Sequence, residues 1–151
     1  METTLTDEIF DSDCIFCTIV RGNAEASFVD QDEHTIAFMD IRPVQPGHTL
    51  VVPRRHAQYL HQFDDTMLEH LWAAAMRVYR AVWLSGIPME AVNLVVADGA
   101  AASQEIPHAH IHLVPRSQDD GFGFRFPAGY GTLPPRAELE ALATRIRAAV
   151  A

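Results

Sequence analysis

The chain has 151 residues and a mass of 16.8 kDa, a length typical of one domain with a sizeable core. Hydrophobic residues make up 48% and charged residues 21%, which excludes an intrinsically disordered protein. The formal net charge of −9 opposes nucleic-acid binding, and no apolar run is long enough for a transmembrane helix. Residues 1–13 are acidic, unlike a signal peptide, so we expect a cytoplasmic protein with a loose tail over residues 1–10.

The first third of the chain predicts a short helix and three strands. The helix covers Cys14 to Arg21 and ends at Gly22, a residue type that is common at helix ends. Phe28-Val29 and the segment His34 to Asp40 are predicted strands. Thr49 to Pro53 is a third predicted strand, an apolar run that ends at a proline.

The segment from Asp64 to Ser85 is the clearest predicted helix. Its apolar residues recur at three- and four-residue spacing, which is typical of a helix with one buried face. Thr66 and Glu69 are spaced as a capping box near its start, and Gly86 follows its end. The apolar stripe consists of Met67, Leu68, Leu71, Trp72, Ala75, Val78, Tyr79 and Val82.

The rest of the chain predicts a fourth strand, Val92 to Ala97, and then a loop of small residues, Asp98 to Ile106. Such a loop allows backbone N–H groups to approach an anion closely. After Arg116, glycines, prolines and aromatic residues predict a loop over Asp119 to Pro135. Pro135 to Val150 predicts a closing helix with one apolar face.

Three histidines at alternate positions, His108, His110 and His112, stand in a stretch that predicts a strand over Pro107 to Val114. Because successive side chains of a strand point to opposite faces, the three imidazoles share one face. Imidazole titrates near neutral pH and acts as a base, a nucleophile or a metal ligand. The pattern therefore predicts a functional site, but it does not separate a nucleophilic site from a zinc site.

Both cysteines of the chain lie in the segment Cys14-Ile15-Phe16-Cys17. A structural disulfide is not expected in a chain without an export signal. The pair is then a redox motif, half of a zinc site or two buried thiols. Because zinc needs two further ligands and the chain is rich in histidine, we favour the zinc site.

Taken together, these motifs resemble the histidine triad family. The segment Gln104 to Val114 is similar to the signature of that family, His-x-His-x-His with apolar residues between the histidines. Three other segments agree with family motifs in the same order, namely Cys14 to Cys17, Ala37 to Ile41, and Gly47 to Pro53 with His56.

The resemblance implies an α+β fold, with a central antiparallel sheet, one long helix packed on it and a C-terminal helix. It implies a single domain over residues 11–151, with the family motifs at 14–116 and a C-terminal loop and helix at 117–151. It also implies a homodimer with the long helix and a sheet edge at its interface.

Members of that family bind nucleotides and cleave a bond to the α-phosphate of a nucleoside phosphate, which implies a hydrolase or a nucleotidyl transferase here. His110 would be the nucleophile of a nucleotidyl-histidine intermediate, and His112 would contact phosphate oxygens or the leaving group. His48 and the backbone of His108 would hold the orientation of the His110 ring. The implied substrate is a purine nucleoside phosphoramidate or a dinucleoside polyphosphate.

The same resemblance implies a nucleotide pocket and a structural zinc ion. Apolar residues would hold the base and ribose, Asp40 would accept the ribose hydroxyls, and the loop before the triad would bind phosphate. The implied pocket residues are Ile15, Phe16, Ile19, Phe38, Asp40, Ile41, Ser103, Gln104 and Glu105. The implied zinc ligands are Cys14, Cys17, His56 and His108, a closed set that suits stability rather than catalysis.

Two positions depart from the family pattern and bear on the substrate. Ala97 stands where many members have Asn or Gln, so one polar contact to phosphate or ribose is missing. Glu105 stands where many members have Ser or Thr. Its carboxylate would either supply a proton to a leaving group or repel a polyanionic substrate.

Three other functions stay open at the level of sequence. One is a metal-dependent hydrolase in which His108, His110 and His112 chelate a catalytic zinc ion. Another is a nucleotide-binding regulator without turnover, which the loss of a polar side chain at Ala97 favours. The last is a structural zinc protein without a ligand, which leaves the row of imidazoles unexplained.

Overall fold

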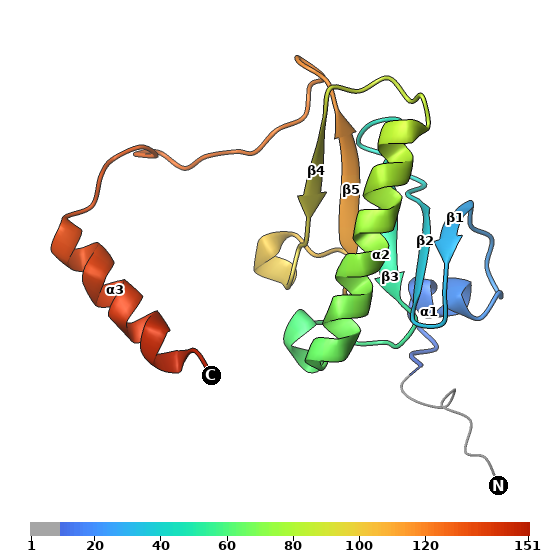
Figure 1. Cartoon of the computed structure of the whole chain (residues 1–151), viewed down its shortest axis with the longest axis horizontal. Helices are drawn as coiled ribbons and strands as arrows, with labels where there is room; N and C mark the ends of the chain where they lie inside the picture. Colours follow the sequence, from blue (N-terminus) through green and yellow to red (C-terminus); the bar gives the residue numbers. More distant parts are fainter. Residues whose placement is uncertain (1–9) are drawn as a thin grey trace, which may run out of the picture. The chain divides into compact units, whose positions relative to one another are not determined.

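A five-stranded antiparallel sheet carries the histidine segment in the computed structural model, which describes residues 10–151 (Figure 1). The strands lie in the order β1-β2-β3-β5-β4, and all neighbours are antiparallel. This arrangement confirms the predicted α+β class with a central antiparallel sheet. The strands are β1 (Phe28–Gln31), β2 (Thr35–Met39), β3 (Thr49–Pro53), β4 (Ala91–Val95) and β5 (Ile111–Arg116).

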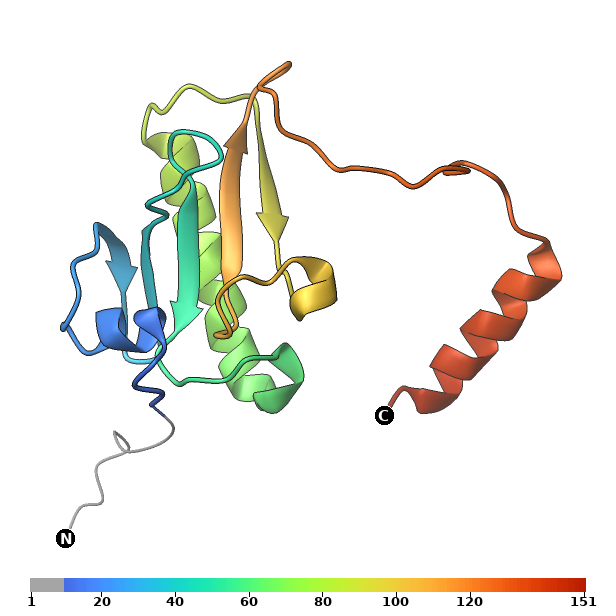
Figure 2. The same cartoon turned by 180° about the vertical axis from the view of Figure 1, so that it is seen from behind.

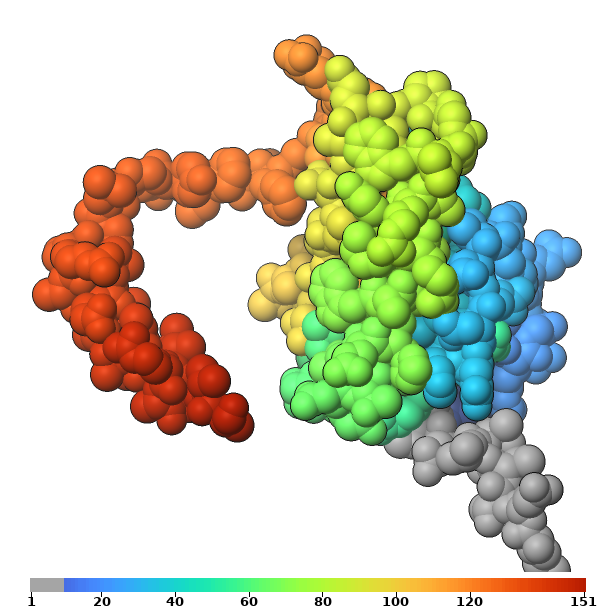
Figure 3. Space-filling model, in the orientation of Figure 1, coloured from blue at the N-terminus to red at the C-terminus, as the bar shows by residue number. Residues whose placement is uncertain are grey.

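The long helix α2 (Asp65–Leu84) packs on one face of the sheet, as predicted. In the space-filling view its side chains cover the middle of that face (Figure 3). The residues that the helix and the strands bury together form one hydrophobic cluster, so burial of this apolar stripe holds the helix to the sheet. The cluster consists of Ala37, Val51, Leu71, Ala74, Ala75, Val78, Val82, Ile111 and Leu113.

The start of α2 differs from the prediction. The Asp64 side chain accepts a hydrogen bond from the Met67 N–H at 2.8 Å and is the N-cap, so the expected capping box of Thr66 and Glu69 is wrong. A carboxylate at residue 64 reaches an N–H of the first turn that has no partner inside the helix, and its charge also favours the positive end of the helix dipole.

A second core lies on the opposite face of the sheet, where the helix α1 (Ile15–Val20) packs (Figure 2). Alternation along the strands separates the two cores, because Ala37 and Val51 face α2 while their neighbours Phe38 and Leu50 face α1. The second core consists of Cys14, Phe16, Cys17, Ile19, Ile36, Phe38, Leu50 and Val52.

Only part of the histidine segment is a strand. β5 begins at Ile111, four residues later than the predicted strand over Pro107 to Val114. Pro107 has no N–H to donate, and the Ala109 N–H bonds to the carbonyl of Ala57 at 2.8 Å instead of joining a strand ladder. The carbonyl of His108 is therefore available to a side chain, because no neighbouring strand uses it, while its N–H donates to the carbonyl of Ile106 at 2.8 Å.

The chain divides into two compact units, one up to Asp120 and one over Gly121–Ala151. The second unit contains the predicted closing helix, α3 (Arg136–Ala149), in which no residue is buried. Its apolar residues Leu139, Leu142 and Ile146 are exposed. The single domain expected over residues 11–151 stays a prediction.

The remaining segments are short. Two 3-10 turns, η1 (Leu60–Gln62) and η2 (Ala100–Ala102), lie before α2 and after β4. Within residues 10–151, none of the helices has both the length and the apolar character needed to cross a membrane. The tail predicted over residues 1–10 lies, except for its last residue, outside the described part of the chain.

Two leucines on α2 provide a matched test of the core. Leu71 is 1% exposed and Leu84 is 86% exposed. Leu71→Ala should lower the free energy of unfolding by about 2–5 kcal/mol because it leaves a cavity in the α2 core. Leu84→Ala should change it by no more than about 0.5 kcal/mol. Urea unfolding followed by circular dichroism measures both, and equal losses would contradict the packing described.

Candidate active site

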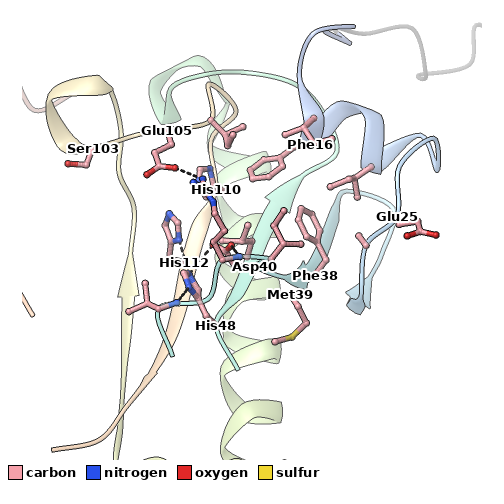
Figure 4. Close-up of a pocket in the computed structure, with 18 residues that line it drawn as sticks. Phe16, Glu25, Phe38, Met39, Asp40, His48, Ser103, Glu105, His110 and His112 are labelled. Atoms are coloured by element: carbon pink, nitrogen blue, oxygen red, sulfur yellow. Dashed lines mark hydrogen bonds and ion pairs between the residues drawn. The ribbon is translucent and has the colours of Figure 1, made fainter. Parts of the chain in front are cut away.

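A cavity of about 440 Å³ lies on the α1 face of the sheet, beside the histidine segment (Figure 4). The structure brings most of the predicted catalytic and nucleotide-binding residues to its wall. Two predicted residues, Gln104 and His108, do not line it. The predicted residues that do line it are Ile15, Phe16, Ile19, Phe38, Asp40, Ile41, His48, Ser103, Glu105, His110 and His112.

One side of the cavity is aromatic. Phe16 meets Phe38 edge to face with ring centroids 5.4 Å apart, and it meets the His110 ring at 5.1 Å. Figure 4 shows both phenylalanines on one side of His110, with Ser103 and Glu105 on the other side. The cavity therefore has an apolar half suited to a flat ring and a polar half beyond the imidazoles.

The His110 ring is held in one tautomer by the backbone. Its Nδ1 lies 2.6 Å from the carbonyl oxygen of His108, and because a carbonyl only accepts, Nδ1 carries the proton and donates. In the neutral ring the lone pair is then on Nε2. Burial lowers the pKa of His110 below its usual value, so the neutral form dominates at neutral pH.

His48 and His112 form a second hydrogen-bonded chain. The Val44 N–H donates to Nδ1 of His48 at 3.1 Å, so the proton of the neutral His48 ring is on Nε2. That Nε2–H donates to Nδ1 of His112 at 3.0 Å, which leaves the His112 proton on its own Nε2. His112 is thus a hydrogen-bond donor next to His110, with ring centroids 4.6 Å apart.

The position of His48 refines its expected role. From the family resemblance we expected His48 to hold the orientation of the His110 ring, whereas the His48 ring is hydrogen-bonded to His112. Burial lowers the pKa of His48, and it lowers the pKa of His112 to about 4. Both rings are therefore neutral near pH 7, and the direction of their hydrogen bond is defined.

Cys14, Cys17, His56 and His108 form a compact group of ligand atoms, all within 4.8 Å of one another. Nδ1 of His108 lies 3.4 Å from Cys14 Sγ and 3.3 Å from Nδ1 of His56, and Cys17 Sγ lies 3.3 Å from that same His56 nitrogen. Nε2 of His108 donates to the Pro53 carbonyl at 2.8 Å, so the lone pair of the ring is on the Nδ1 that faces the thiols.

This donor set fits a zinc ion. Two sulfurs and two imidazole nitrogens make the closed tetrahedral type of structural site, and the second nitrogen of His108 has the carbonyl partner that zinc-binding histidines usually have. Burial raises the pKa of the Cys17 thiol to about 11, so without a cation the buried sulfur holds its proton. A bound metal ion would favour the thiolate instead.

A second group of ligand-type residues, Asp40, His48 and His112, lies inside the cavity. The hydrogen bonds of His48 argue against a metal ion there. Its Nδ1 accepts from the Val44 N–H and its Nε2 carries the proton, so the neutral ring has no lone pair left for a metal ion. The geometry therefore favours a hydrogen-bonding role for this group.

The loop before the histidine segment is shaped by Gln104. Its Oε1 accepts the Gly99 N–H at 2.9 Å, and its Nε2 donates to the Gln58 carbonyl at 2.9 Å. Ser103 takes a left-handed backbone conformation with φ of 69°. Gln104 thus fixes the loop from within, and Ser103 and Glu105 are the loop residues that reach the cavity.

Several lining residues were missed by the sequence analysis, among them Glu25, Met39, Arg42 and Val44. Arg42 and Val44 flank Pro43 in the turn after β2, and that turn folds back onto His48. Arg42 also pairs with Glu105 at 2.7 Å. The proline turn next to Asp40 was the one sequence signal available, and it did not indicate which side chains would face the cavity.

Comparison with known sequences finds a matching family model and similar proteins. The HIT domain family model matches residues 21–119. Protein hit of Bacillus subtilis is 37% identical over 111 residues, which are 73% of this chain and 76% of that protein. An uncharacterised HIT-like protein of Borreliella burgdorferi is 37% identical over 114 residues, which are 75% of this chain and 82% of that protein.

Solved structures share the fold. A HIT family protein from Bacillus subtilis superposes with a TM-score of 0.83 at 31% identity, covering 92% of this chain and 98% of that one. A zinc-bound histidine triad protein from Mycobacterium smegmatis gives 0.70 at 34% identity, covering 91% and 98%. A histidine triad nucleotide-binding protein from Candida albicans gives 0.78 at 26% identity, covering 89% and 94%.

The lowered pKa of His112 makes folding stability depend on pH. Between pH 6.5 and about 4, the unfolded chain binds a proton at this residue that the folded chain does not bind. Stability should therefore decrease as the pH falls through this window. His112→Gln should lose less stability than the wild type over the same window, measured by urea unfolding, while the exposed control His61→Gln should behave as the wild type. An unchanged dependence in His112→Gln would contradict this assignment.

Proposed function

The chain belongs to the HIT domain family, and on that basis we propose that it is a hydrolase that cleaves a bond to the α-phosphate of a purine nucleoside phosphate. The substrate is a nucleoside phosphoramidate or a dinucleoside polyphosphate, and the reaction passes through a nucleotidyl-histidine intermediate. One observation carries the proposal. His110, within a cavity wall, has its Nδ1 bound to a backbone carbonyl, so its Nε2 lone pair is the nucleophile.

The first step joins Nε2 of His110 to the α-phosphorus while the bond to the leaving group breaks. The ring gains positive charge as this bond forms, and the His108 carbonyl at 2.6 Å stabilises the charge through the Nδ1–H. Water then attacks phosphorus, which releases the nucleoside monophosphate and returns His110 to its neutral form. Transfer to another acceptor would follow the same course with that acceptor in place of water.

His112 acts as a hydrogen-bond donor to a phosphate oxygen. Its Nε2–H is available because Nδ1 already accepts from His48. A neutral imidazole N–H stabilises a phosphoryl oxygen well but is a poor acid, so we assign His112 to charge stabilisation. His48 is a positioning residue, since its contact to the reacting atoms runs through His112.

The two halves of the cavity bind different parts of the nucleotide. The purine base lies against Phe16 and Phe38, together with the neighbouring Ile15, Ile19 and Ile41. Asp40 accepts the ribose hydroxyls. The backbone around Ser103 and Glu105 holds the phosphate next to the imidazoles.

We propose that the cluster of Cys14, Cys17, His56 and His108 binds a structural zinc ion. The ion would tie α1 to the histidine segment and so fix the position of the His108 carbonyl. Thiolate ligands need a reducing environment, which supports a cytoplasmic location. The alternative of a catalytic zinc ion on all three histidines has less support, because Nδ1 of His108 faces the thiols and Nδ1 of His110 is bound to a carbonyl.

We also propose that the protein is a homodimer that pairs α2 and the edge strand β4 with a second copy. On α2, Trp72 and Trp83 are 45% and 43% exposed, and β4 is an edge of the sheet. Exposed aromatic side chains on one helix are typical of a protein interface.

Light scattering tests the dimer directly. The wild type should have twice the chain mass of 16.8 kDa. Trp83→Glu should shift it toward the monomer, because it places a charge in an apolar interface. The exposed control His61→Glu should leave the mass unchanged. A wild type at the mass of one chain would contradict the proposal.

AMP release from an adenosine phosphoramidate tests the enzyme and the nucleophile. His110→Ala should lower kcat by about a thousandfold or more, because no other group replaces the nucleophile. His61→Ala, a change of an exposed histidine, should retain activity. AMP binding to His110→Ala, measured by calorimetry, shows that the variant is folded. A wild type that binds AMP without turnover would favour the regulator instead.

The same assay separates the two roles of zinc. Wild type stripped of metal by a chelator at moderate temperature should keep part of its activity while its melting temperature falls, because the ion supports the histidine segment and takes no part in the reaction. Complete loss of activity with an intact fold would favour the metal-dependent hydrolase.

A further inference from the structure

Charge is unevenly distributed around the cavity. Among its lining residues in the described chain, the formally charged side chains are three carboxylates, of Glu25, Asp40 and Glu105, and one guanidinium, of Arg42. A wall with an excess of carboxylates disfavours a ligand that carries several negative charges. Arg42 is therefore the lining side chain whose positive charge would offset this repulsion of a polyanionic substrate.

Arg42 is paired within the rim of the cavity. Its Nη2 donates to Oε2 of Glu105 at 2.7 Å and so joins the turn after β2 to the loop before β5. The backbone N–H of Arg42 donates to Oδ1 of Asp40 at 2.8 Å, which anchors the turn. The two side chains of the pair are 76% and 70% exposed, so water screens the pair and it contributes little to folding.

In the proposed binding mode of the nucleotide, the pair lies on the side of the leaving group. Figure 4 shows Glu105 on the side of His110 away from Phe16 and Phe38. A nucleotide with its base against the phenylalanines and its α-phosphorus at His110 extends its remaining group toward Glu105. The carboxylate is then closer to the leaving group than to the base.

We propose that the Arg42–Glu105 pair selects the leaving group and favours an amine over a polyphosphate. The proposal rests on the proposed cleavage at the α-phosphate. Glu105 stabilises a phosphoramidate nitrogen that is protonated before its bond to phosphorus breaks, and it repels a leaving nucleoside polyphosphate. The same carboxylate holds Arg42, the lining guanidinium that would otherwise bind the extra phosphates.

Release of the amine from the phosphoramidate needs no acidic group of the protein. The phosphoramidate nitrogen takes a proton from solvent, and the Glu105 carboxylate stabilises the resulting positive charge. As the bond from His110 Nε2 to phosphorus forms, the P–N bond breaks and its electron pair returns to nitrogen. The amine leaves uncharged and then takes a proton from water.

Two substrates that transfer the same adenylate to His110 test the proposal. One is an adenosine phosphoramidate of an alkylamine, and the other is diadenosine triphosphate. The ratio of their kcat/KM values isolates the leaving group, because hydrolysis of the shared intermediate is common to both. The variants are Glu105→Gln, Arg42→Gln and, as a matched control, Glu25→Gln, which removes a carboxylate from the far side of His110 (Figure 4).

Glu105→Gln should raise the ratio of diadenosine triphosphate to phosphoramidate by about tenfold, because it removes a repulsive charge and releases Arg42. Arg42→Gln should lower the ratio, since it leaves Glu105 without its counter-charge. Glu25→Gln should change it by less than about twofold. Equal effects of Glu105→Gln on both substrates would overturn the proposal, because a residue that only shapes the rim would act on both alike.

A binding experiment separates this proposal from the proposed function. If the wild type cleaves neither substrate, the function fails and the selection is measured by calorimetry with AMP and ATP. Glu105→Gln should then raise the affinity for ATP relative to the affinity for AMP by about the same tenfold factor. An unchanged ratio would overturn the selection by charge, whether or not the protein turns over a substrate.

Discussion

A neutral imidazole carries one proton, and the hydrogen bond made by one ring nitrogen decides which nitrogen keeps the lone pair. The site depends on this constraint. Backbone groups make the deciding contact for three rings, through the Pro53 carbonyl to His108, the His108 carbonyl to His110 and the Val44 N–H to His48. In each of these rings, one nitrogen is thereby fixed as the hydrogen-bond donor and the other as the acceptor.

The fold supplies these backbone groups because the histidine segment is irregular before β5. A regular strand would use the His108 carbonyl in a ladder, whereas here it accepts from the His110 ring. The same residue turns its Nδ1 toward Cys14 and Cys17. Zinc bound there would connect the stability of the α1 core to the orientation of the nucleophile, since both pass through His108.

Much of this arrangement could be predicted from the sequence, because it follows from periodicity and residue type. The alternation of Ala37 with Phe38 separates the two cores, and the apolar stripe of α2 indicates its packing. The pairing of Arg42 with Glu105 could not be predicted, because it joins loops 63 residues apart through a turn with no spacing signal. The hydrogen bond from the Val44 N–H to His48 could not be predicted either, because it depends on how the turn at Pro43 folds back.

The tautomers of the histidine rings are the most direct test of this account. Nitrogen NMR of protein labelled with ¹⁵N-histidine reports which ring nitrogen of each residue carries the proton near neutral pH. The account predicts the proton of His110 on Nδ1 and the protons of His48 and His112 on Nε2. A His110 ring with its proton on Nε2 would remove the lone pair from the attacking position and contradict the central claim.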